Sequence, residues 1–183
     1  LFNAMFDYNR TFAQKHNVSA LLVASGFQQT ISGTYHRTAN ANLGVQAAYN
    51  YDKRYYVDFS GAVVHSAKLA PGHRNAFSPS VTLGWKIANE SFLKDSDAVN
   101  DLTLSVSGSV LNQDIDIPDY FLYAPVWKTD NYGYEWNDGN LSQYVTASRG
   151  PNEYLSFIQR KEVSANLKAS FFDRLLSFDA SYF

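Results

Sequence analysis

The residues best suited to recognising a ligand are aromatic side chains in the segment from Asp114 to Phe157. Connections of this length are usually functional or disordered, and the density of rings argues against disorder. Exposed tyrosine and tryptophan rings stack on sugars or contact partner proteins. The candidate ligand-binding residues are Tyr120, Tyr123, Trp127, Tyr132, Tyr134 and Trp136. The alternative is that most of the rings fold the segment into a small cluster, with one or two of them touching a ligand or partner.

Carboxylates and imidazoles are the other residues with ligating chemistry. Asp114, Asp116 and Asp119 stand close enough in sequence to hold a hard cation. No glycine turn and bidentate glutamate complete an EF-type loop, so a solvated loop is the favoured interpretation. The histidines are dispersed, and we expect them to be solvated or hydrogen-bonded side chains: His16, His36, His65 and His73. We therefore predict no metal site.

Catalytic and cofactor-binding motifs are absent from the sequence. It contains no GxxxxGK[ST], GxGxxG, HExxH or GxSxG pattern and no cysteine, so phosphate cradles, zinc proteases and serine or cysteine nucleophiles have no support. The formal net charge of -2 argues against a nucleic-acid partner. We expect neither catalytic residues nor a cofactor.

The elements that carry these residues are predicted from alternating apolar and polar side chains. Alternation with a period of two residues is typical of a strand with one apolar face. It is clearest in four segments: Ser80 to Ile87, Asp101 to Val110, Glu162 to Phe171 and Leu176 to Tyr182. Four further strands follow from their content of Val, Tyr, Phe and Ala: Leu1 to Phe12, Val18 to Thr30, Ala41 to Tyr51 and Arg54 to His65. The sequence thus predicts an all-β chain of about eight strands.

Short and long connections alternate along the chain. The short ones are Ala13 to Asn17, Tyr51 to Lys53 and Phe172 to Arg174, and the long ones are Ile31 to Asn40, Ser66 to Ser78 and Asp114 to Phe157. Asn89 to Asn100 is longer than the other short turns, and we expect one helical turn within it at Glu90 to Lys94. Such alternation indicates an antiparallel up-and-down meander whose two ends face different environments. No linker divides the chain into domains.

Two architectures fit this pattern. In a soluble sandwich or lipocalin-like barrel the apolar side chains point inward, whereas in a transmembrane barrel they point to lipid. Only 17% of the residues are charged, while 16% are aromatic. The polar side chains of the strands are mostly Ser, Thr, Asn, Gln and Gly, which suits a wet lumen better than an open surface. Aromatic residues near the short turns resemble an interfacial girdle. We therefore favour a transmembrane β-barrel segment.

Several pieces, in order, resemble the barrel of the SusC-type TonB-dependent transporters of Bacteroidetes. The family's "RYY" strand, "APGxR" loop, "GWRI" strand, "FLK" helix and "SFFDNRLS" turn each have a similar piece in this chain. The matching pieces are Asn9–Phe12, Lys15–Val18, Lys53–Asp58, Ala70–Arg74, Phe77–Glu90, Phe92–Lys94, Val99–Leu102 and Lys161–Ser177. Ordered matches are more specific than any one motif. The chain departs from the family at Ala62–Leu69, where the family's charged residues are absent, and at Lys86, where the family has arginine.

The resemblance implies a function as well as a fold. Residues 1–183 would form part of a larger barrel in the outer membrane, with 114–157 as a long extracellular loop. Such a transporter imports a bulky nutrient, such as an oligosaccharide or peptide. It works with a SusD-like surface lipoprotein, and it takes energy from the TonB complex through a plug region that we expect to precede Leu1. No enzymatic activity is implied.

Two alternatives remain at this point. A self-contained eight-stranded outer-membrane barrel, acting as an anchor or adhesin, would pair the first strand with the last. Such a barrel would end in a phenylalanine that serves as an assembly signal and points outward with the apolar side chains. Phe183 instead alternates with the polar residues of its strand, which argues against this alternative. A soluble lipocalin-like binder would place Trp85, Leu104 and Leu167 in a dry interior.

Overall fold

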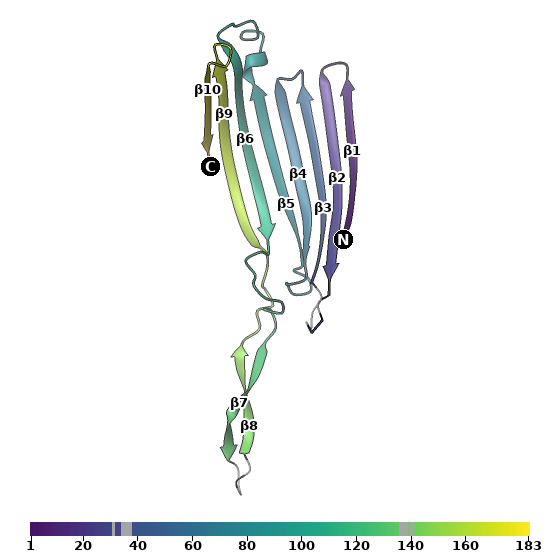
Figure 1. Cartoon of the computed structure of the whole chain (residues 1–183), viewed down its shortest axis with the longest axis vertical. Coiled ribbons are helices and arrows are strands. Elements are labelled where there is room, and N and C mark those ends of the chain that lie inside the picture. Colours follow the sequence, from purple (N-terminus) through teal and green to yellow (C-terminus); the bar gives the residue numbers. More distant parts are fainter. Residues whose placement is uncertain (31, 34–37, 136–138, 140) are drawn as a thin grey trace.

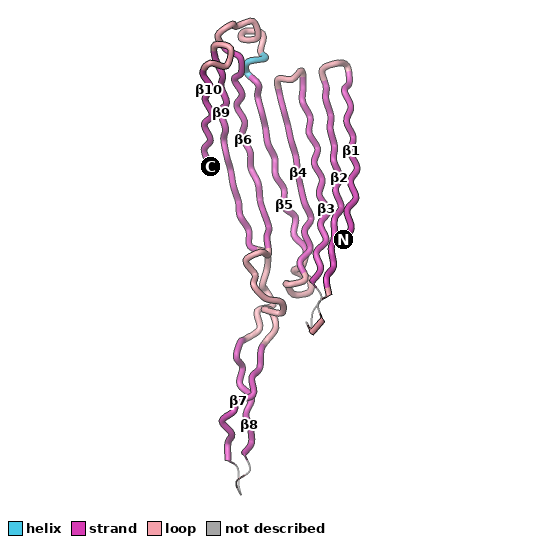
Figure 2. Tube along the Cα trace, in the orientation of Figure 1, coloured by secondary structure: helices cyan, strands magenta, loops and turns pink. Residues whose placement is uncertain are grey.

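The strands of this chain form one large antiparallel sheet and a separate hairpin (Figures 1 and 2). The computed structural model describes residues 1–30, 32–33, 38–135, 139 and 141–183, and the side chains of 38, 130–135 and 141–143 are not described. The large sheet contains β1 (Phe2–Phe12), β2 (His16–Gln29), β3 (Thr38–Tyr51), β4 (Tyr55–Ser66), β5 (Asn75–Lys86), β6 (Val99–Gln113), β9 (Ile158–Phe171) and β10 (Leu176–Tyr182). The hairpin consists of β7 (Val126–Glu135) and β8 (Leu141–Arg149). A 3₁₀ turn, η1 (Ile87–Asn89), follows β5.

The large sheet is an up-and-down meander in the order β1-β2-β3-β4-β5-β6-β9-β10. At the end drawn uppermost in Figure 1, three of the four connections are tight turns and the exception is the segment of residues 87–98 between β5 and β6, whereas none of the connections at the other end is a tight turn. We call these the short-turn end and the long-loop end. The β7–β8 hairpin projects from the long-loop end, within the connection between β6 and β9. The predicted meander with two different ends is therefore confirmed.

Cross-strand pairing places the apolar side chains on one face. Trp85 is paired with Tyr55 in β4 and with Leu104 in β6, and Leu104 is paired with Leu167 in β9. Paired residues of antiparallel strands point to the same face. This apolar face includes Phe6, Phe12, Val18, Leu22, Leu43, Val45, Tyr49, Val57, Phe59, Val63, Val81, Leu83, Val106, Val163 and Phe178.

The opposite, polar face carries hydroxyl, amide and a few charged side chains. Its members include Asn9, Thr11, Asn17, Ser19, Gln46, Asn50, Asp58, Ser60, Ser80, Thr82, Ser105, Ser107, Glu162, Ser164, Asn166 and Lys168. The separation has exceptions in both directions. Met5 and Leu21 lie on the polar face, while Arg10 and Lys161 lie on the apolar face.

The sheet is a single layer, and no described element covers its apolar face. Leu83 remains 54% exposed and Val163 72% exposed. The buried apolar residues of the described chain are Leu69, Ala70, Ala88, Ile117 and Ala169, and all but Ala169 lie outside the strands. An uncovered apolar face of this size marks a surface that another apolar phase or partner must cover. No helix among the described residues has both the length and the apolar character needed to span a membrane.

The structure excludes both architectural alternatives. β1 and β10 lie at opposite edges of the sheet, so the chain does not close into an eight-stranded barrel. Trp85 and Leu104 are 38% and 39% exposed. These side chains are therefore outside any dry interior, which contradicts the lipocalin-like arrangement.

All eight predicted strands are present, but the bounds of β5 differ from the prediction. β5 begins at Asn75, five residues before the predicted start at Ser80. Pro79 lies inside it, paired with Gly61 in β4. A proline lacks the N–H that a central strand needs. Here β5 pairs with β6 only from Ser80 to Lys86, so Pro79 stands beyond the paired stretch. The β7–β8 hairpin was not predicted.

Non-glycine residues with positive φ form the tight turns. Ala13 and Gln14 have φ values of 47° and 58°, and the N–H of Lys15 donates to the carbonyl oxygen of Phe12 at 3.2 Å. Asp52 and Lys53 repeat the arrangement with φ values of 51° and 55°. Positive φ at both central positions suits the right-handed twist of the flanking strands. It also strains any residue that carries a Cβ atom.

Gln14→Gly should therefore raise the free energy of unfolding by about 1 kcal/mol, because glycine adopts positive φ without strain. Urea unfolding of the protein in lipid vesicles would measure the change. Gln28→Gly in β2 is the matched control, and we expect it to lower the free energy of unfolding, since glycine weakens a strand interior. Equal effects of the two substitutions would contradict the turn assignment.

Candidate functional site

The polar face of the large sheet is the most extensive candidate surface. Thr11 Oγ1 donates to Asn17 Oδ1 at 2.7 Å, and Asn17 Nδ2 donates to Asn50 Oδ1 at 2.8 Å, so one chain of hydrogen bonds crosses β1, β2 and β3. Further along, the hydroxyls of Ser107 and Ser164 lie 2.7 Å apart across β6 and β9. These bonds run sideways between strands. They fix amide and hydroxyl groups in place on the surface.

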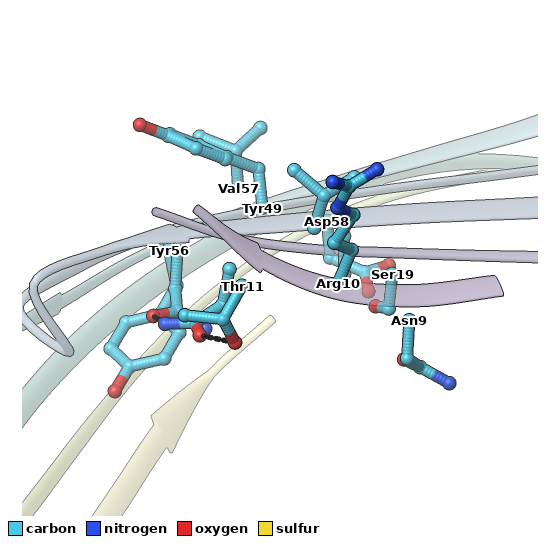
Figure 3. Close-up of a pocket in the computed structure, with 12 residues that line it drawn as sticks. Asn9, Arg10, Thr11, Ser19, Tyr49, Tyr56, Val57 and Asp58 are labelled. Carbon is cyan, nitrogen blue, oxygen red and sulfur yellow. Dashed lines mark hydrogen bonds between the residues drawn. The ribbon is translucent and has the colours of Figure 1, made fainter. Parts of the chain in front are cut away.

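A hollow of about 350 Å³ opens beside this chain of hydrogen bonds. On the polar face its lining residues are Asn9, Thr11, Asn17, Ser19, Ala48, Asn50, Tyr56 and Asp58. Figure 3 shows Tyr56, Thr11 and Asn9 on one side of the sheet and Tyr49, Val57 and Arg10 on the other. This wall of amide and hydroxyl groups offers many weak hydrogen bonds to a polar solute, and Asp58 adds one carboxylate.

Charged side chains on the polar face are largely paired with each other. Lys168 Nζ lies 3.6 Å from Asp179 Oδ2, and Lys86 Nζ lies 3.7 Å from Asp101 Oδ1. Asp58 accepts a hydrogen bond of 2.9 Å from Gln46 Nε2. Exposed pairs of this kind contribute little to stability. Their effect here is to leave the surface close to neutral.

The described residues offer no catalytic or metal-binding arrangement. His16 Nδ1 lies 2.8 Å from the hydroxyl of Tyr49, and His65 Nδ1 lies 2.8 Å from Asn75 Oδ1. Neither imidazole contacts a serine, so neither activates a nucleophile. No group of three or more His, Cys, Asp or Glu side chains converges in the described part of the chain. His36 lies outside the described residues.

Long-loop end

The loop between β4 and β5 anchors the start of the long connection. Leu69 is fully buried and Ile117 is 4% exposed, so the two side chains belong to a small core outside the sheet. Lys68 Nζ donates to the carbonyl oxygens of Ile117 at 2.7 Å and Asp114 at 3.3 Å. The Ser66 hydroxyl donates to the Asp114 carboxylate. Asp114 therefore helps to hold the start of the long connection against the β4–β5 loop.

Asn112 bridges the point where β5 and β6 part. It is 5% exposed, and its Nδ2 donates to the carbonyl oxygen of Phe77 at 2.7 Å. Its Oδ1 accepts a bond of 2.9 Å from Gln159 Nε2, and its backbone N–H donates to Ser78 Oγ at 3.0 Å. One amide side chain thus connects β5, β6 and β9 where the regular pairing between β5 and β6 has stopped.

The predicted aromatic residues fall into three groups. Tyr120 and Tyr123 are half-buried, with ring centroids 6.4 and 6.2 Å from that of Phe121 between them. These two rings help to fold the base of the connection. Trp127, on β7, is 63% exposed. The backbones of Tyr132 and Tyr134 lie in β7, but their side chains are not described, and Trp136 lies outside the described residues.

Arg149 fastens the base of the hairpin. Its Nη2 donates to the carbonyl oxygens of Phe121 at 3.1 Å and Ala124 at 3.3 Å. The N–H of Asn152 donates to the carbonyl oxygen of Tyr123 at 3.0 Å. The two sides of the connection are therefore joined before the hairpin begins. Nothing in the residue pattern near Arg149 signalled this role.

Short-turn end

Sequence reasoning also missed a polar cluster at the short-turn end. Glu90 is only 7% exposed, and its carboxylate accepts bonds from Trp85 Nε1 at 3.0 Å and Arg54 Nη1 at 3.1 Å. Arg54 Nη2 also donates to Asp52 Oδ2 at 2.7 Å. The cluster joins the β3–β4 turn to the segment after β5.

The hydrogen bonds within this cluster shift the pKa values of both charged partners. The pKa of Glu90 is lowered, chiefly by the hydrogen bond from Tyr55 and then by those from Trp85 and Arg54. The pKa of Arg54 is raised, chiefly by its hydrogen bond to Glu90. Each partner therefore favours the charged form of the other.

Similarity to known proteins

Sequence comparison finds curated relatives among TonB-dependent receptors. The chain is 28% identical over 140 residues to TonB-dependent receptor SusC of Bacteroides thetaiotaomicron, a match that covers 75% of this chain and 14% of that receptor. The chain is related to the SusC-type TonB-dependent transporters. A TonB-dependent receptor of Formosa agariphila is 25% identical over 191 residues, covering 85% of this chain and 18% of the relative. No family model matches the chain.

Solved structures agree on the fold. The RagAB peptide transporter superposes with a TM-score of 0.79 and 19% sequence identity, covering 98% of this chain and 22% of that chain. The same transporter in its closed-closed state gives a TM-score of 0.78. This SusC-related chain thus spans between 14% and 22% of the length of the proteins it matches. The predicted resemblance, the β-barrel class and the outer-membrane location are confirmed.

Replacing Glu90 by Gln should make the stability of the short-turn end less dependent on pH. The folded-state pKa of Glu90 lies below its unfolded value, so the carboxylate stabilises the fold fully above the ordinary carboxyl pKa. That stabilisation is lost as the pH falls through the lowered value. Thermal unfolding in vesicles would measure this. At pH 7 the native protein should unfold at a higher temperature than the variant, and the difference should shrink as the pH is lowered to 3.

Glu153→Gln provides the matched control for this experiment. Glu153 is exposed in the long connection and takes part in none of the ion pairs of the described residues. Its removal should leave the pH dependence unchanged. A Glu90 variant with the pH profile of the native protein would show that the cluster does not depend on the carboxylate charge.

Proposed function

We propose that this chain forms part of the barrel wall of a TonB-dependent outer-membrane importer of a bulky nutrient. The observation that carries the proposal is that a single sheet, in a chain related to SusC, has an exposed apolar face on one side and a polar face on the other. A transmembrane barrel needs an apolar exterior against lipid and a polar interior for its cargo. No chemical step is assigned to this segment.

The orientation of the wall follows from the lengths of its connections. Outer-membrane barrels have short periplasmic turns and long extracellular loops. We therefore assign the short-turn end to the periplasm and the long-loop end to the exterior. Residues 114–157, which carry the β7–β8 hairpin, then form an extracellular loop.

The cargo class follows from the proposed interior surface and from the loop. Amide and hydroxyl groups line the polar face, and the exposed ring of Trp127 stands on the hairpin. Such groups suit an oligosaccharide or a peptide, whose polar atoms accept and donate weak hydrogen bonds. Tyr120, Tyr123, Tyr132, Tyr134 and Trp136 are further candidates on the same loop.

Two partners complete the proposal. By resemblance to the family, a SusD-like surface lipoprotein would cover the extracellular mouth, and the TonB complex would supply energy through a plug domain. The supporting observation in this chain is that the base of the β6–β9 connection is held by hydrogen bonds from Lys68, Asn112 and Arg149. A fixed base lets such a loop present its tip to a partner in a defined position.

The orientation of the faces is tested by arginine substitution at adjacent positions of β6. Val106 is on the apolar face and 44% exposed, whereas Ser105 is on the polar face. Val106→Arg should destabilise the folded barrel by about 2–4 kcal/mol, the cost of a charge against lipid at mid-depth. Ser105→Arg should cost much less. Urea unfolding in vesicles would compare them, and a reversed order would refute the assignment.

Nutrient import is tested in cells that express the full-length protein. Uptake of labelled oligosaccharides and labelled peptides should require both the protein and an intact TonB complex. Trp127→Ala should raise the half-saturating concentration of the true cargo about threefold to tenfold, the effect of losing one stacking contact. Phe92→Ala is the control, because Phe92 is an exposed ring at the opposite end of the sheet. Uptake that persists without TonB would reject the proposal.

A further inference from the structure

Three basic side chains gather at the short-turn end beside the apolar face. Arg10 lies in β1, Lys15 lies in the β1–β2 turn and Lys53 lies in the β3–β4 turn, and all three are exposed. The two turns are neighbours, because the N–H of Asp52 donates to the carbonyl oxygen of Lys15 at 2.7 Å. We name Arg10, Lys15 and Lys53 the basic turn patch.

Arg10 projects from the apolar face, as Lys161 does near the opposite end of the sheet. Its cross-strand partner is Val18, which is in turn paired with Tyr49. Figure 3 shows Arg10 on the same side of the sheet as Tyr49 and Val57. A guanidinium among apolar side chains that face lipid is costly unless it reaches the membrane surface and meets an anion there.

The guanidinium of Arg10 lies beside an aromatic ring at the end of β1. Its guanidinium carbon lies 4.8 Å from the centre of the Phe12 ring, and Phe12 is the residue of β1 nearest the turn. The guanidinium therefore lies beside the ring nearest the turn. At this end of a strand a long arginine side chain can place its charge among lipid headgroups.

No carboxylate of the described residues neutralises the patch. None of its three members belongs to an ion pair within the part of the chain that the structure describes. Asp52, in the same turn as Lys53, is held by Arg54 at 2.7 Å. Asp7, close to Arg10 in β1, lies on the polar face. The patch therefore offers its positive charge to a partner outside the sheet.

Aromatic rings and an imidazole border the patch at the same depth. His16 Nδ1 lies 2.8 Å from the hydroxyl of Tyr49, and the His16 ring centroid lies 5.1 Å from that of Tyr51. Phe12 is paired with His16 across the strands. Amphipathic rings occupy the headgroup level of a bilayer. Their presence places the basic turn patch at the level of the phosphates.

We propose that the basic turn patch binds the phosphate of an anionic phospholipid in the leaflet at the short-turn end. The guanidinium of Arg10 donates to the phosphate oxygens, and the two lysines add charge from the adjoining turns. The acyl chains lie against Phe6, Leu22 and Val45 on the apolar face. The inference requires the outer-membrane location and is independent of the cargo.

The experiment measures lipid retained by the full-length protein after extraction into mild detergent. The protein is equilibrated with phosphatidylglycerol or with phosphatidylcholine, and bound lipid is counted by native mass spectrometry. We expect the native protein to retain phosphatidylglycerol preferentially. Each cation replaced should lower retention about fivefold, and Arg10→Gln, Lys15→Gln and Lys53→Gln are tested singly and together.

Lys161→Gln is the matched control. Lys161 is also a cation on the apolar face, but it lies at the long-loop end of β9. Its replacement should leave the retention of phosphatidylglycerol unchanged. Equal loss in the control and in the Arg10 variant would overturn the proposal, because it would show a general effect of surface charge.

The dependence of lipid retention on salt can be measured on the native protein, so this part of the test does not require any variant to fold. Raising the salt concentration from 0.1 M to 1 M shortens the screening length from about 10 Å to about 3 Å. Retained phosphatidylglycerol should then fall while retained phosphatidylcholine stays constant. A native protein that holds both lipids equally at low salt would refute the site without any substitution.

Discussion

The structure depends on the pairing of backbone hydrogen bonds within a single layer of strands. An ordinary domain also gains stability from side chains packed between two layers, but the strands of this sheet bury almost no side chain. Against lipid an unpaired N–H or C=O group has no alternative partner, so the ladder between strands must be continuous. The alternating pattern, the tight turns and the unbroken order of strands all follow from this requirement.

Where the backbone hydrogen bonds between neighbouring strands stop, hydrogen bonds from side chains take their place. Pro79 stands where β5 is no longer paired with β6, and Asn112 supplies the missing bonds at that point. At the opposite end Glu90, Arg54 and Trp85 hold the segment after β5 against the neighbouring turn. Each group replaces regular pairing by hydrogen bonds from a side chain that is buried or partly buried.

The sequence predicted the strands, which depend on local pattern. It did not predict the clusters formed by residues that are distant in sequence and meet only in the fold. Four strands of the sheet were predicted from alternation and four from their content of Val, Tyr, Phe and Ala, and both signals are local because they do not depend on where the strand lies. Glu90 and Asn112 look ordinary in sequence, and their partners stand far away along the chain. The start of β5 was predicted too late. A proline normally marks the end of a central strand, and the sequence does not show that β5 lacks a partner on its β6 side at Pro79. The hairpin was missed because its strands lack clear alternation among many aromatic residues.

The parting of β5 and β6 has a mechanical consequence. Sideways hydrogen bonds make most of the wall stiff in its own plane, but between these two strands they occupy only the half nearest the short turns. A lateral pull at the mouth is resisted there by Asn112 and by the small core around Leu69 instead of a ladder. The sheet is therefore less constrained between β5 and β6 at its long-loop end than at its short-turn end.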